Sequence, residues 1–375
     1  MSYKSLVLDL GKLAEVTIGD NPWDIKVHNE KFYKKFLSKG SLGLGEAYME
    51  GWWDCQQLDE FFYRVIKAKV RNKIQRNIKL IASLLIAKIF NQQTFKKSKR
   101  VAKQHYDLDL ELFKKMLGST MSYTCGYWNK AKTLEEAQIA KFDLICKKLD
   151  LKENEKVLDM GSGFGGLSKY MAEKYKCRVT GVNISESHHN YAKNLCGNKV
   201  NFCLCDYRYP EKYLQPGEKF DKIVSVGMFE AIGPKNFKIF FKIMQTILKD
   251  EGLFLLHTIG APKDQRRGDP WILKYIFPGG VIPKAGEITK NTDELFVLED
   301  WHNFGFDYYK TLKAWFNNFD KYWTEVKQKN KDNELYRMWK YYLLMCAGIF
   351  KARKTSLWQI VFSKGGIPGG YASIR

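Results

Sequence analysis

A glycine-rich turn at residues 159–166 (DMGSGFGG) holds the residues whose spacing most clearly suggests binding chemistry. Gly161, Gly163 and Gly166 fit the pattern GxGxxG, and Gly165 lies within it. Glycine lets the backbone approach a ligand closely, and the helix expected to follow presents free N–H groups. The pattern alone does not choose the ligand, because nicotinamide-dinucleotide enzymes use it as well.

Two details around the turn favour S-adenosylmethionine over a dinucleotide. A dinucleotide site places an acidic residue about 20 positions further on, where it binds the ribose diol, but Asn183 stands there. Asp159 directly precedes the glycines, where a carboxylate could face the cationic groups of S-adenosylmethionine. Asp206 closes a later strand, where it is either a contact for the adenine amino group or an ordinary turn residue.

The elements around the turn alternate between helical segments and short apolar runs of strand type. A helical pattern follows the turn at 167–174, and the strand-like runs lie at 156–160, 178–183, 200–205, 222–226 and 253–257. Strands separated by helices indicate βαβ units and a parallel sheet. The sequence therefore predicts an α/β fold that carries the turn at the end of its first strand.

The N-terminal part of the chain has a different pattern. It is mostly helical, with glycines that punctuate a turn-rich segment before Trp52 and Trp53. We predict a small helical domain over residues 1–94, a basic linker over 95–104 and a larger α/β domain over 105–375.

Positive charge is concentrated between Phe61 and Gln104, where thirteen Lys and Arg residues occur without an Asp or Glu. Apolar residues recur between these cations at helical spacing: Ile66, Val70, Ile74, Ile78, Ile81 and Leu85. Such a helix could pack its stripe on a core, bind nucleic acid through counterion release, or lie on an anionic membrane. Charge alone does not choose between these interpretations.

Composition excludes several classes of protein. The 375 residues are 45% hydrophobic and 15% aromatic, which excludes a disordered chain, and their net charge is +21. The apolar stretch at 80–87 is far shorter than the roughly 20 residues of a membrane-spanning helix. The first residues lack a signal-peptide pattern, so we expect a protein of the cytosol that is soluble or bound peripherally to a membrane.

The eight cysteines include no CxxC pair, which favours reduced thiols. Cys203 and Cys205 alternate in a predicted strand and share a face. We interpret them as two small buried side chains, and we predict no metal site.

Several motifs in order along the chain resemble those of the cyclopropane-fatty-acyl-phospholipid synthases. The motifs are SLGLGEAYMEGWWDC (41–55), YTCGYW (123–128), the glycine turn, SVGMFEAIGPKN (225–236), LLHTIG (255–260), DPWILKYIFPGG (269–280), EDWHNFGFDY (299–308) and YYLLMCAGIFKAR (341–353). The resemblance covers roughly residues 21–363. It implies a class I methyltransferase fold, Rossmann-like with a mostly parallel seven-stranded sheet, as the catalytic domain behind a small helical domain that helps engage lipid.

The resemblance also implies an activity. The family transfers the methyl group of S-adenosylmethionine to a cis double bond of an acyl chain in a phospholipid and closes a cyclopropane ring. Its members are often dimers on the membrane surface. We therefore expect a homodimer that is peripheral on the inner face of the cytoplasmic membrane. We assign the basic stretch to anionic lipid, with Arg64, Lys67, Arg71, Lys73, Arg76 and Lys79 as candidate contacts.

The resemblance places two sets of site residues. The cofactor contacts fall on Tyr123, Gly161, Gly163, Asn183, Asp206 and Tyr207, to which the turn adds Asp159 and Gly165. A bicarbonate pocket falls on Cys125, Glu230, His257, Ile259 through its backbone, and Tyr308. The sequence departs from the family pattern at Ser162, Phe164, Asn183 and Ala231, of which Ala231 removes a polar side chain beside Glu230.

The proposed chemistry asks for further groups. Methyl transfer to an alkene leaves a carbocation, which aromatic faces could stabilise. The candidate rings are Tyr275, Phe277, Trp301 and Phe304, for each of which core packing is the alternative. Cys346 is a candidate nucleophile, but direct methylation requires no covalent enzyme intermediate, so we favour a buried structural thiol.

Two other functions remain open. A nucleic-acid methyltransferase would show a DPPY-like strand end after the fourth strand, where this chain has Met228, Phe229 and Glu230. A lipid-binding protein that has lost catalysis is the second alternative. We expect an enzyme that acts on a bilayer of unsaturated phospholipid and has no nucleic-acid partner.

Overall fold

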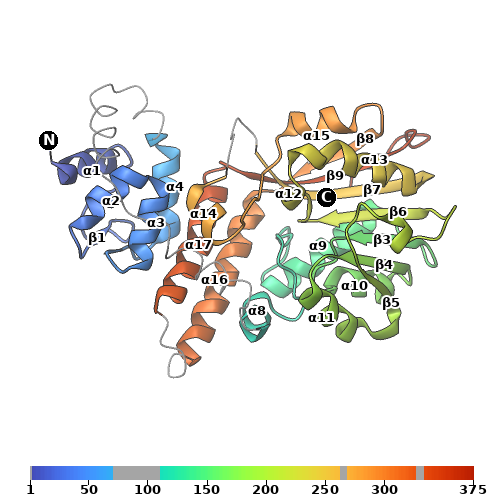
Figure 1. The fold of residues 1–375 in the computed structure, drawn as a ribbon, viewed down its shortest axis with the longest axis horizontal. Helices are drawn as coiled ribbons and strands as arrows, with labels where there is room; N and C mark the ends of the chain where they lie inside the picture. Colours follow the sequence, from blue (N-terminus) through green and yellow to red (C-terminus); the bar gives the residue numbers. More distant parts are fainter. Residues whose placement is uncertain (1, 71–109, 262–267, 327–332) are drawn as a thin grey trace. The chain divides into compact units, whose positions relative to one another are not determined.

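The computed structural model describes residues 2–70, 110–261, 268–326 and 333–375, which form two compact units (Figure 1). The first, here called the helical unit, consists of residues 1–116, 266–279 and 312–354. The second, the sheet unit, consists of residues 117–265, 280–311 and 355–375.

The helical unit is built mainly from helices. They are α1 (Tyr3–Lys12), α2 (Lys31–Lys39), α3 (Ser41–Met49), α4 (Leu58–Lys67), α8 (Leu110–Leu117), α14 (Pro270–Tyr275) and α17 (Asn333–Lys351), with the antiparallel pair β1 (Lys26–Val27) and β2 (Trp53–Asp54). A further helix, α16 (Phe306–Val326), begins in the sheet unit and ends in the helical unit. The prediction of an N-terminal helical region agrees with these elements.

The division of the chain differs from the predicted domain boundaries. Segments of the predicted 105–375 domain fold with the N-terminal helices because their side chains complete that core. Trp271 of α14 packs so tightly on Gly45 of α3 that an added Cβ would lie 2.4 Å from its ring. Arg337 of α17 donates through Nη2 to the Trp53 carbonyl oxygen at 2.7 Å. The predicted linker over 95–104 lies outside the described residues.

The sheet unit contains a seven-stranded sheet with the order β5-β4-β3-β6-β7-β9-β8. Its strands are β3 (Lys156–Met160), β4 (Arg178–Asn183), β5 (Val200–Leu204), β6 (Phe220–Val226), β7 (Leu248–Gly260), β8 (Val297–Asn303) and β9 (Ser356–Ser363). The first five pair in parallel, which confirms the predicted mostly parallel sheet, and β3 and β4 have the predicted bounds. The strands β8 and β9, whose bounds were not predicted, form an antiparallel edge.

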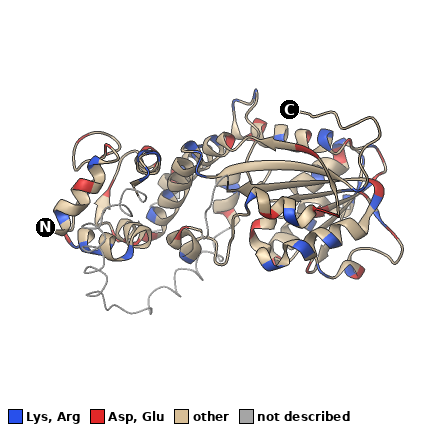
Figure 2. Ribbon diagram, turned by 90° about the horizontal axis from the view of Figure 1, so that it is seen from above, with Lys and Arg blue, Asp and Glu red and all other residues tan. Residues whose placement is uncertain are grey.

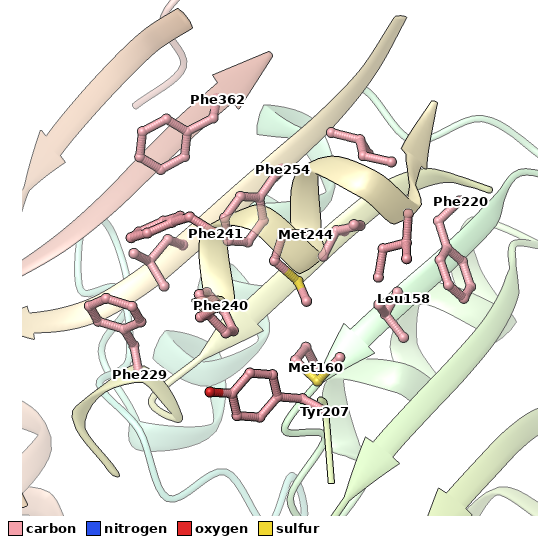
Figure 3. Packing of buried hydrophobic residues seen from close by; sticks show 14 of the residues in the cluster. Leu158, Met160, Tyr207, Phe220, Phe229, Phe240, Phe241, Met244, Phe254 and Phe362 are labelled. Carbon is pink, nitrogen blue, oxygen red and sulfur yellow. The ribbon is translucent and has the colours of Figure 1, made fainter. Parts of the chain in front are cut away.

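Helices cover both faces of this sheet (Figure 1). The helices of this unit are α9 (Leu134–Lys148), α10 (Gly166–Lys174), α11 (Glu186–Cys196), α12 (Phe229–Ile232), α13 (Phe237–Ile247) and α15 (Ala285–Thr292), together with the short 3₁₀ helices η2 (Gly197–Lys199), η3 (Pro210–Lys212) and η4 (Pro234–Asn236). Figure 3 shows Leu158 and Met160 packed with the α13 residues Phe240, Phe241 and Met244. Residues of β3 alternate between the two faces, so Asp159 points toward the face covered by α9, α10 and α11.

Charged residues lie mainly on the helices, whereas the middle of the sheet is nearly free of them (Figure 2). Of the six basic residues assigned to lipid, Arg64 and Lys67 are described, and Arg71, Lys73, Arg76 and Lys79 lie outside the described residues. The guanidinium of Arg64 stacks 3.9 Å from the Trp23 ring centroid and pairs with Glu60. In the described ranges, no helix combines the length and apolarity needed to cross a bilayer.

Candidate active site

The glycine turn begins directly after β3 and bends because three of its glycines adopt positive φ. These are Gly161 (85°), Gly163 (52°) and Gly165 (85°), the last of which caps α10. A Cβ on Gly161 would lie 2.7 Å from the Met228 side chain, whereas a Cβ on Gly163 would meet nothing within 4 Å. The turn is therefore packed at Gly161 and open at Gly163, where a ligand can reach the backbone.

Asp159 lies beneath this turn and is 2% exposed. Its Oδ2 accepts a hydrogen bond from Ser168 Oγ of α10 at 2.6 Å. Burial raises the pKa of Asp159 to about 6, and the hydrogen bond from Ser168 and the charge of Lys141 oppose that rise. The carboxyl group therefore supports the turn from within the core.

The other polar residues predicted to bind a cofactor have partners within the chain. Asn183 Nδ2 donates to the Gly163 carbonyl oxygen at 2.9 Å, and its Oδ1 accepts from the Ser185 amide. Asp206 Oδ2 pairs with Arg208 Nη2 at 2.7 Å, and this pairing lowers the pKa of Asp206. Asn183 thus fixes the open part of the turn, and Asp206 shares its carboxylate with an arginine.

Two residues of the predicted cofactor set are aromatic. Tyr207 is buried next to Phe240, and its hydroxyl group has no hydrogen-bond partner among the described residues. Tyr123 is half-buried in the segment after Met121. Both rings belong to the unit that contains the glycine turn.

His257 is the most buried polar residue of the predicted bicarbonate pocket, at 1% exposed. Gln359 of β9 pairs with it in register, and the Gln359 Nε2 amide donates to His257 Nδ1 at 3.2 Å. Because an amide nitrogen can only donate, the neutral ring carries its proton on Nε2. Burial lowers the pKa of His257 well below its usual value. In the described part of the chain nothing accepts the Nε2 proton, so the site presents a buried N–H donor.

Glu230, at the start of α12, is the carboxyl group of the same predicted pocket. Its Oε1 accepts a hydrogen bond from the Ile259 amide at 2.6 Å, so the structure joins these two predicted residues directly. Its Oε2 is buried without a partner in the described ranges. Burial raises the pKa of Glu230, and the hydrogen bond from the Ile259 amide opposes that rise. Ala231, by contrast, is exposed.

The segment at 122–128, which contains Cys125, is held by the first turns of α16. Thr311 Oγ1 accepts from the Gly126 amide at 3.0 Å, and Asp307 Oδ2 accepts from the Trp128 amide at 2.7 Å. Cys125 is fully buried, and burial raises the pKa of its thiol well above the usual range. Tyr308, which is 9% exposed, follows Asp307 on the same helix. The predicted pocket residues thus all belong to the sheet unit.

The four candidate rings for a carbocation fall in different places. Phe304 lies edge-on to His257, with ring centroids 5.9 Å apart. Trp301 packs on Trp358 against the sheet core. Tyr275 and Phe277 belong to the helical unit, where the Tyr275 hydroxyl donates to Glu46. Phe304 is therefore the candidate ring that contacts the predicted pocket.

The thiols assigned other roles are distinct from the pocket. Cys346 lies on α17 in the helical unit, and burial raises its pKa, so it is no thiolate nucleophile at neutral pH. Cys203 and Cys205 lie with their sulfur atoms 3.1 Å apart. Among the described residues, no three His, Cys, Asp or Glu side chains gather as metal ligands.

Sequence reasoning missed three residues that hold the site together: Gln359, Thr311 and Lys141. Gln359 reaches His257 only because β9 pairs with β7, and Thr311 lies far along the chain from Gly126. Lys141 is a lysine within a helical pattern, where the usual expectation is a solvated side chain. A lysine on the apolar face of the helical pattern at 134–148 would have been the signal for Lys141.

Known proteins share both the sequence and the fold. Residues 93–360 match the family model described as mycolic acid cyclopropane synthetase. The chain is 47% identical over 348 residues to the cyclopropane-fatty-acyl-phospholipid synthase of Escherichia coli strain K12, a match that covers 92% of this chain and 89% of the relative.

Two solved structures support the fold assignment. The cyclopropane synthase MmaA2 from Mycobacterium tuberculosis matches with a TM-score of 0.63 and 27% identity, over 73% of this chain and 100% of that one. The mycolic acid cyclopropane synthase CmaA1 complexed with SAH and CTAB matches with a TM-score of 0.62 and 28% identity over the same shares. The predicted class I methyltransferase fold is confirmed.

Proposed function

The chain belongs to the family of the mycolic acid cyclopropane synthetases, and from this premise we propose that it converts cis double bonds of phospholipid acyl chains into cyclopropane rings with S-adenosylmethionine as methyl donor. Membership confirms the resemblance inferred from the motifs. The observation that carries the proposal is the pair of buried, unpartnered polar atoms, His257 Nε2 and Glu230 Oε2, in the same unit as an open glycine turn.

The glycine turn is the proposed seat of S-adenosylmethionine. Gly163 leaves its backbone accessible, and the N-terminus of α10 offers N–H groups to a ligand carboxylate. Asn183 keeps this turn in shape through the Gly163 carbonyl oxygen. The mycobacterial relative crystallised with SAH supports this choice of ligand class.

The proposed reaction needs little covalent help from the protein. The π electrons of the alkene form a bond to the donated methyl carbon while the carbon–sulfur bond breaks, which leaves S-adenosylhomocysteine. A C–H bond of the new methyl group then supplies the electrons that close the ring, and its proton leaves. The protein must hold the alkene in line and exclude water, and Phe304 beside His257 offers an aromatic face to the positive carbon.

Bicarbonate is the proposed group that takes this proton, and the donor set fits such an anion. His257 Nε2 offers an N–H donor, and Glu230 Oε2 is a second buried atom that has no partner among the described residues. Ile259 orients Glu230 through its amide, and Cys125 and Tyr308 complete the predicted pocket. The neutral imidazole carries no charge, and the raised pKa of Glu230 makes its carboxyl group easier to protonate. A single bound anion therefore meets less repulsion in this buried site.

We also propose that the protein works as a homodimer bound peripherally to the inner face of the cytoplasmic membrane, and that anionic lipid strengthens this binding. The net charge of +21 supports electrostatic attraction to such a surface. Binding to anionic vesicles is expected to weaken as salt screens the charges. Equal binding to neutral and anionic vesicles at every salt concentration would contradict the membrane assignment.

The test of the activity separates it from the two alternatives. The protein is incubated with methyl-labelled S-adenosylmethionine, vesicles of unsaturated phospholipid and, in a parallel sample, nucleic acid. We expect acyl chains that gain one CH₂, lose the double bond and carry the label. Label in nucleic acid alone would establish the methyltransferase alternative, and binding of vesicles without any labelled product would establish a lipid-binding protein.

A further inference from the structure

Helix α9 carries a buried amine that the reaction described above does not use. Lys141 is 1% exposed, and its Nζ donates to Ser122 Oγ, to Thr124 Oγ1 at 2.8 Å and to Gln138 Oε1 at 2.7 Å. An ammonium group has three N–H donors, and here each finds an oxygen. Within the described ranges no carboxylate forms an ion pair with it, so its charge is buried without a direct counter-ion.

The acceptors of Lys141 belong to the segment that contains Tyr123 and Cys125. The same segment is bound through its backbone, because Gln138 Nε2 donates to the Thr124 carbonyl oxygen at 2.9 Å. Ala137 lies one turn before Lys141 on α9, and its carbonyl oxygen accepts from the Tyr127 amide at 2.8 Å. Side chains and main chain of one helix face therefore fix residues 122–127.

Thr124, which Lys141 holds, also forms part of the wall near His257. A Cβ on Gly227, after β6, would lie 2.7 Å from Thr124 Cγ2. The Gly227 amide in turn donates to the His257 carbonyl oxygen at 2.9 Å. A displacement of Thr124 would thus reach the end of β7 that carries His257, whose Nε2 has no partner in the described part of the chain.

The charge of Lys141 acts on groups at both ends of the site. Burial lowers the pKa of Lys141 to about 7, and the charge of Asp159 opposes this effect. The pKa of His257 is lowered mainly by burial, and the charges of Lys141 and then Lys148 lower it further. An anion that accepts a hydrogen bond from His257 would therefore be attracted by Lys141, whereas a second buried lysine on α9, Lys148, is already paired with Asp300 at 3.2 Å.

We propose that Lys141 is a positioning residue of the active site: its three hydrogen bonds hold residues 122–125 in place, and its charge favours an anion beside His257. The first part stands on the hydrogen bonds alone, and the second rests on the proposed bicarbonate pocket. Lys141 is assigned no contact with substrate or with the reacting atoms.

The test of the first part is hydrogen exchange of the amides of residues 122–126, measured by mass spectrometry on the full chain. In Lys141→Met these amides are expected to exchange at least tenfold faster, because lost hydrogen bonds lower the cost of local opening. The matched control is Lys148→Met, which removes a buried lysine of the same helix and leaves this exchange unchanged. Equal exchange in wild type and Lys141→Met would overturn the proposal.

The test of the second part is the bicarbonate concentration that gives half-maximal turnover. It is expected to rise at least tenfold in Lys141→Met and to stay within twofold in Lys148→Met. Lys141→Gln keeps donors without the charge, so it should restore slow exchange but not the bicarbonate response, and it serves as well if the methionine variant does not fold. A wild type that makes no cyclopropane product would refute the proposed function, whereas an unchanged half-maximal concentration in Lys141→Met would refute only the role of the charge.

Discussion

The two halves of the candidate site treat their carboxyl, amide and imidazole side chains in opposite ways, although the Ser162 and Tyr207 hydroxyl groups of the turn half are also buried without a partner in the described ranges. At the glycine turn, Asn183, Asp206 and Asp159 all have partners within the chain. At the ends of β6 and β7, His257 Nε2 and Glu230 Oε2 are buried with none among the described residues. A buried polar atom without a partner costs about 1–3 kcal/mol, so the second arrangement is expensive unless a ligand completes it.

This difference indicates how each half recognises its ligand. In the proposed account, the turn binds its ligand through the backbone that its glycines expose, and its side chains keep that backbone in shape. The proposed pocket at His257 binds through side-chain atoms that have no partner among the described residues. Changes in the pocket should therefore affect the chemical step, and changes in the turn should affect cofactor binding.

The largest expected effect comes from removing the open donor of the pocket. His257→Ala should lower kcat by about 10²–10³, the usual loss for one donor to an anionic centre. The dissociation constant for S-adenosylhomocysteine, measured by calorimetry, should stay within about twofold. The control is His302→Ala, which removes a half-buried imidazole from β8. If both variants lost activity equally, the special role of the pocket would be refuted.

The second effect is the pH dependence of folding stability that Lys141 causes. The folded pKa of Lys141, about 7, lies below its usual 10.5, so above pH 7 the unfolded chain binds a proton that the folded chain does not. The wild type should therefore gain about 2–3 kcal/mol of stability between pH 7 and 9 relative to Lys141→Met. The groups that face Lys141, namely Cys125, Asp159 and His257, are common to both proteins.

Urea unfolding of both proteins at the two pH values measures this gain. Because the comparison is between pH values, any constant loss from the missing hydrogen bonds cancels. Parallel stability curves for the two proteins would show that Lys141 keeps an ordinary pKa in the fold.

A third effect sharpens the account of the turn. Gly161→Ala combines a positive φ with a contact of 2.7 Å to Met228, whereas Gly163→Ala meets only the positive φ. Strain of this kind costs of order 1–3 kcal/mol, so Gly161→Ala should lower the free energy of unfolding more than Gly163→Ala does, as urea unfolding measures. Gly163→Ala should weaken binding of S-adenosylhomocysteine, because its Cβ enters the space proposed for the ligand. Turnover at saturating cofactor should change little. The opposite order of the two variants would place the packed side of the turn at Gly163.

The smallest effect tests the helix that supports both halves. Thr133 caps α9 in a capping box with Glu136. Thr133→Ala should cost about 1 kcal/mol of folding stability, as measured by urea unfolding, and should leave kcat unchanged. A large loss of kcat would mean that the site responds to the whole of α9 rather than to Lys141 and its immediate partners.

Much of the sheet was predictable because its signals are local. Apolar runs gave β3 and β4 with their observed bounds, and the glycine spacing identified the turn. The environment of His257 was not predictable in this way. Its partner Gln359 lies on an antiparallel strand whose register with β7 depends on contacts about a hundred residues apart, and no periodicity in either strand specifies that register.

The compact units differ from the predicted domain boundaries for a related reason. Contacts such as that between Trp271 and Gly45 join segments that are distant in the sequence, so patterns along the chain assigned α14 and α17 to the larger domain. Lys141 illustrates a third limit, since its burial depends on acceptors in another segment. From its residue type alone, such a lysine is expected at the surface.

The central claim is that His257 Nε2 and Glu230 Oε2, which have no partner among the described residues, bind a small oxyanion. Its most direct test is turnover on unsaturated phospholipid vesicles in CO₂-depleted buffer. We predict that formation of cyclopropane acyl chains falls to a small fraction of its normal rate and returns when bicarbonate is added. A rate that is the same with and without bicarbonate would contradict the account.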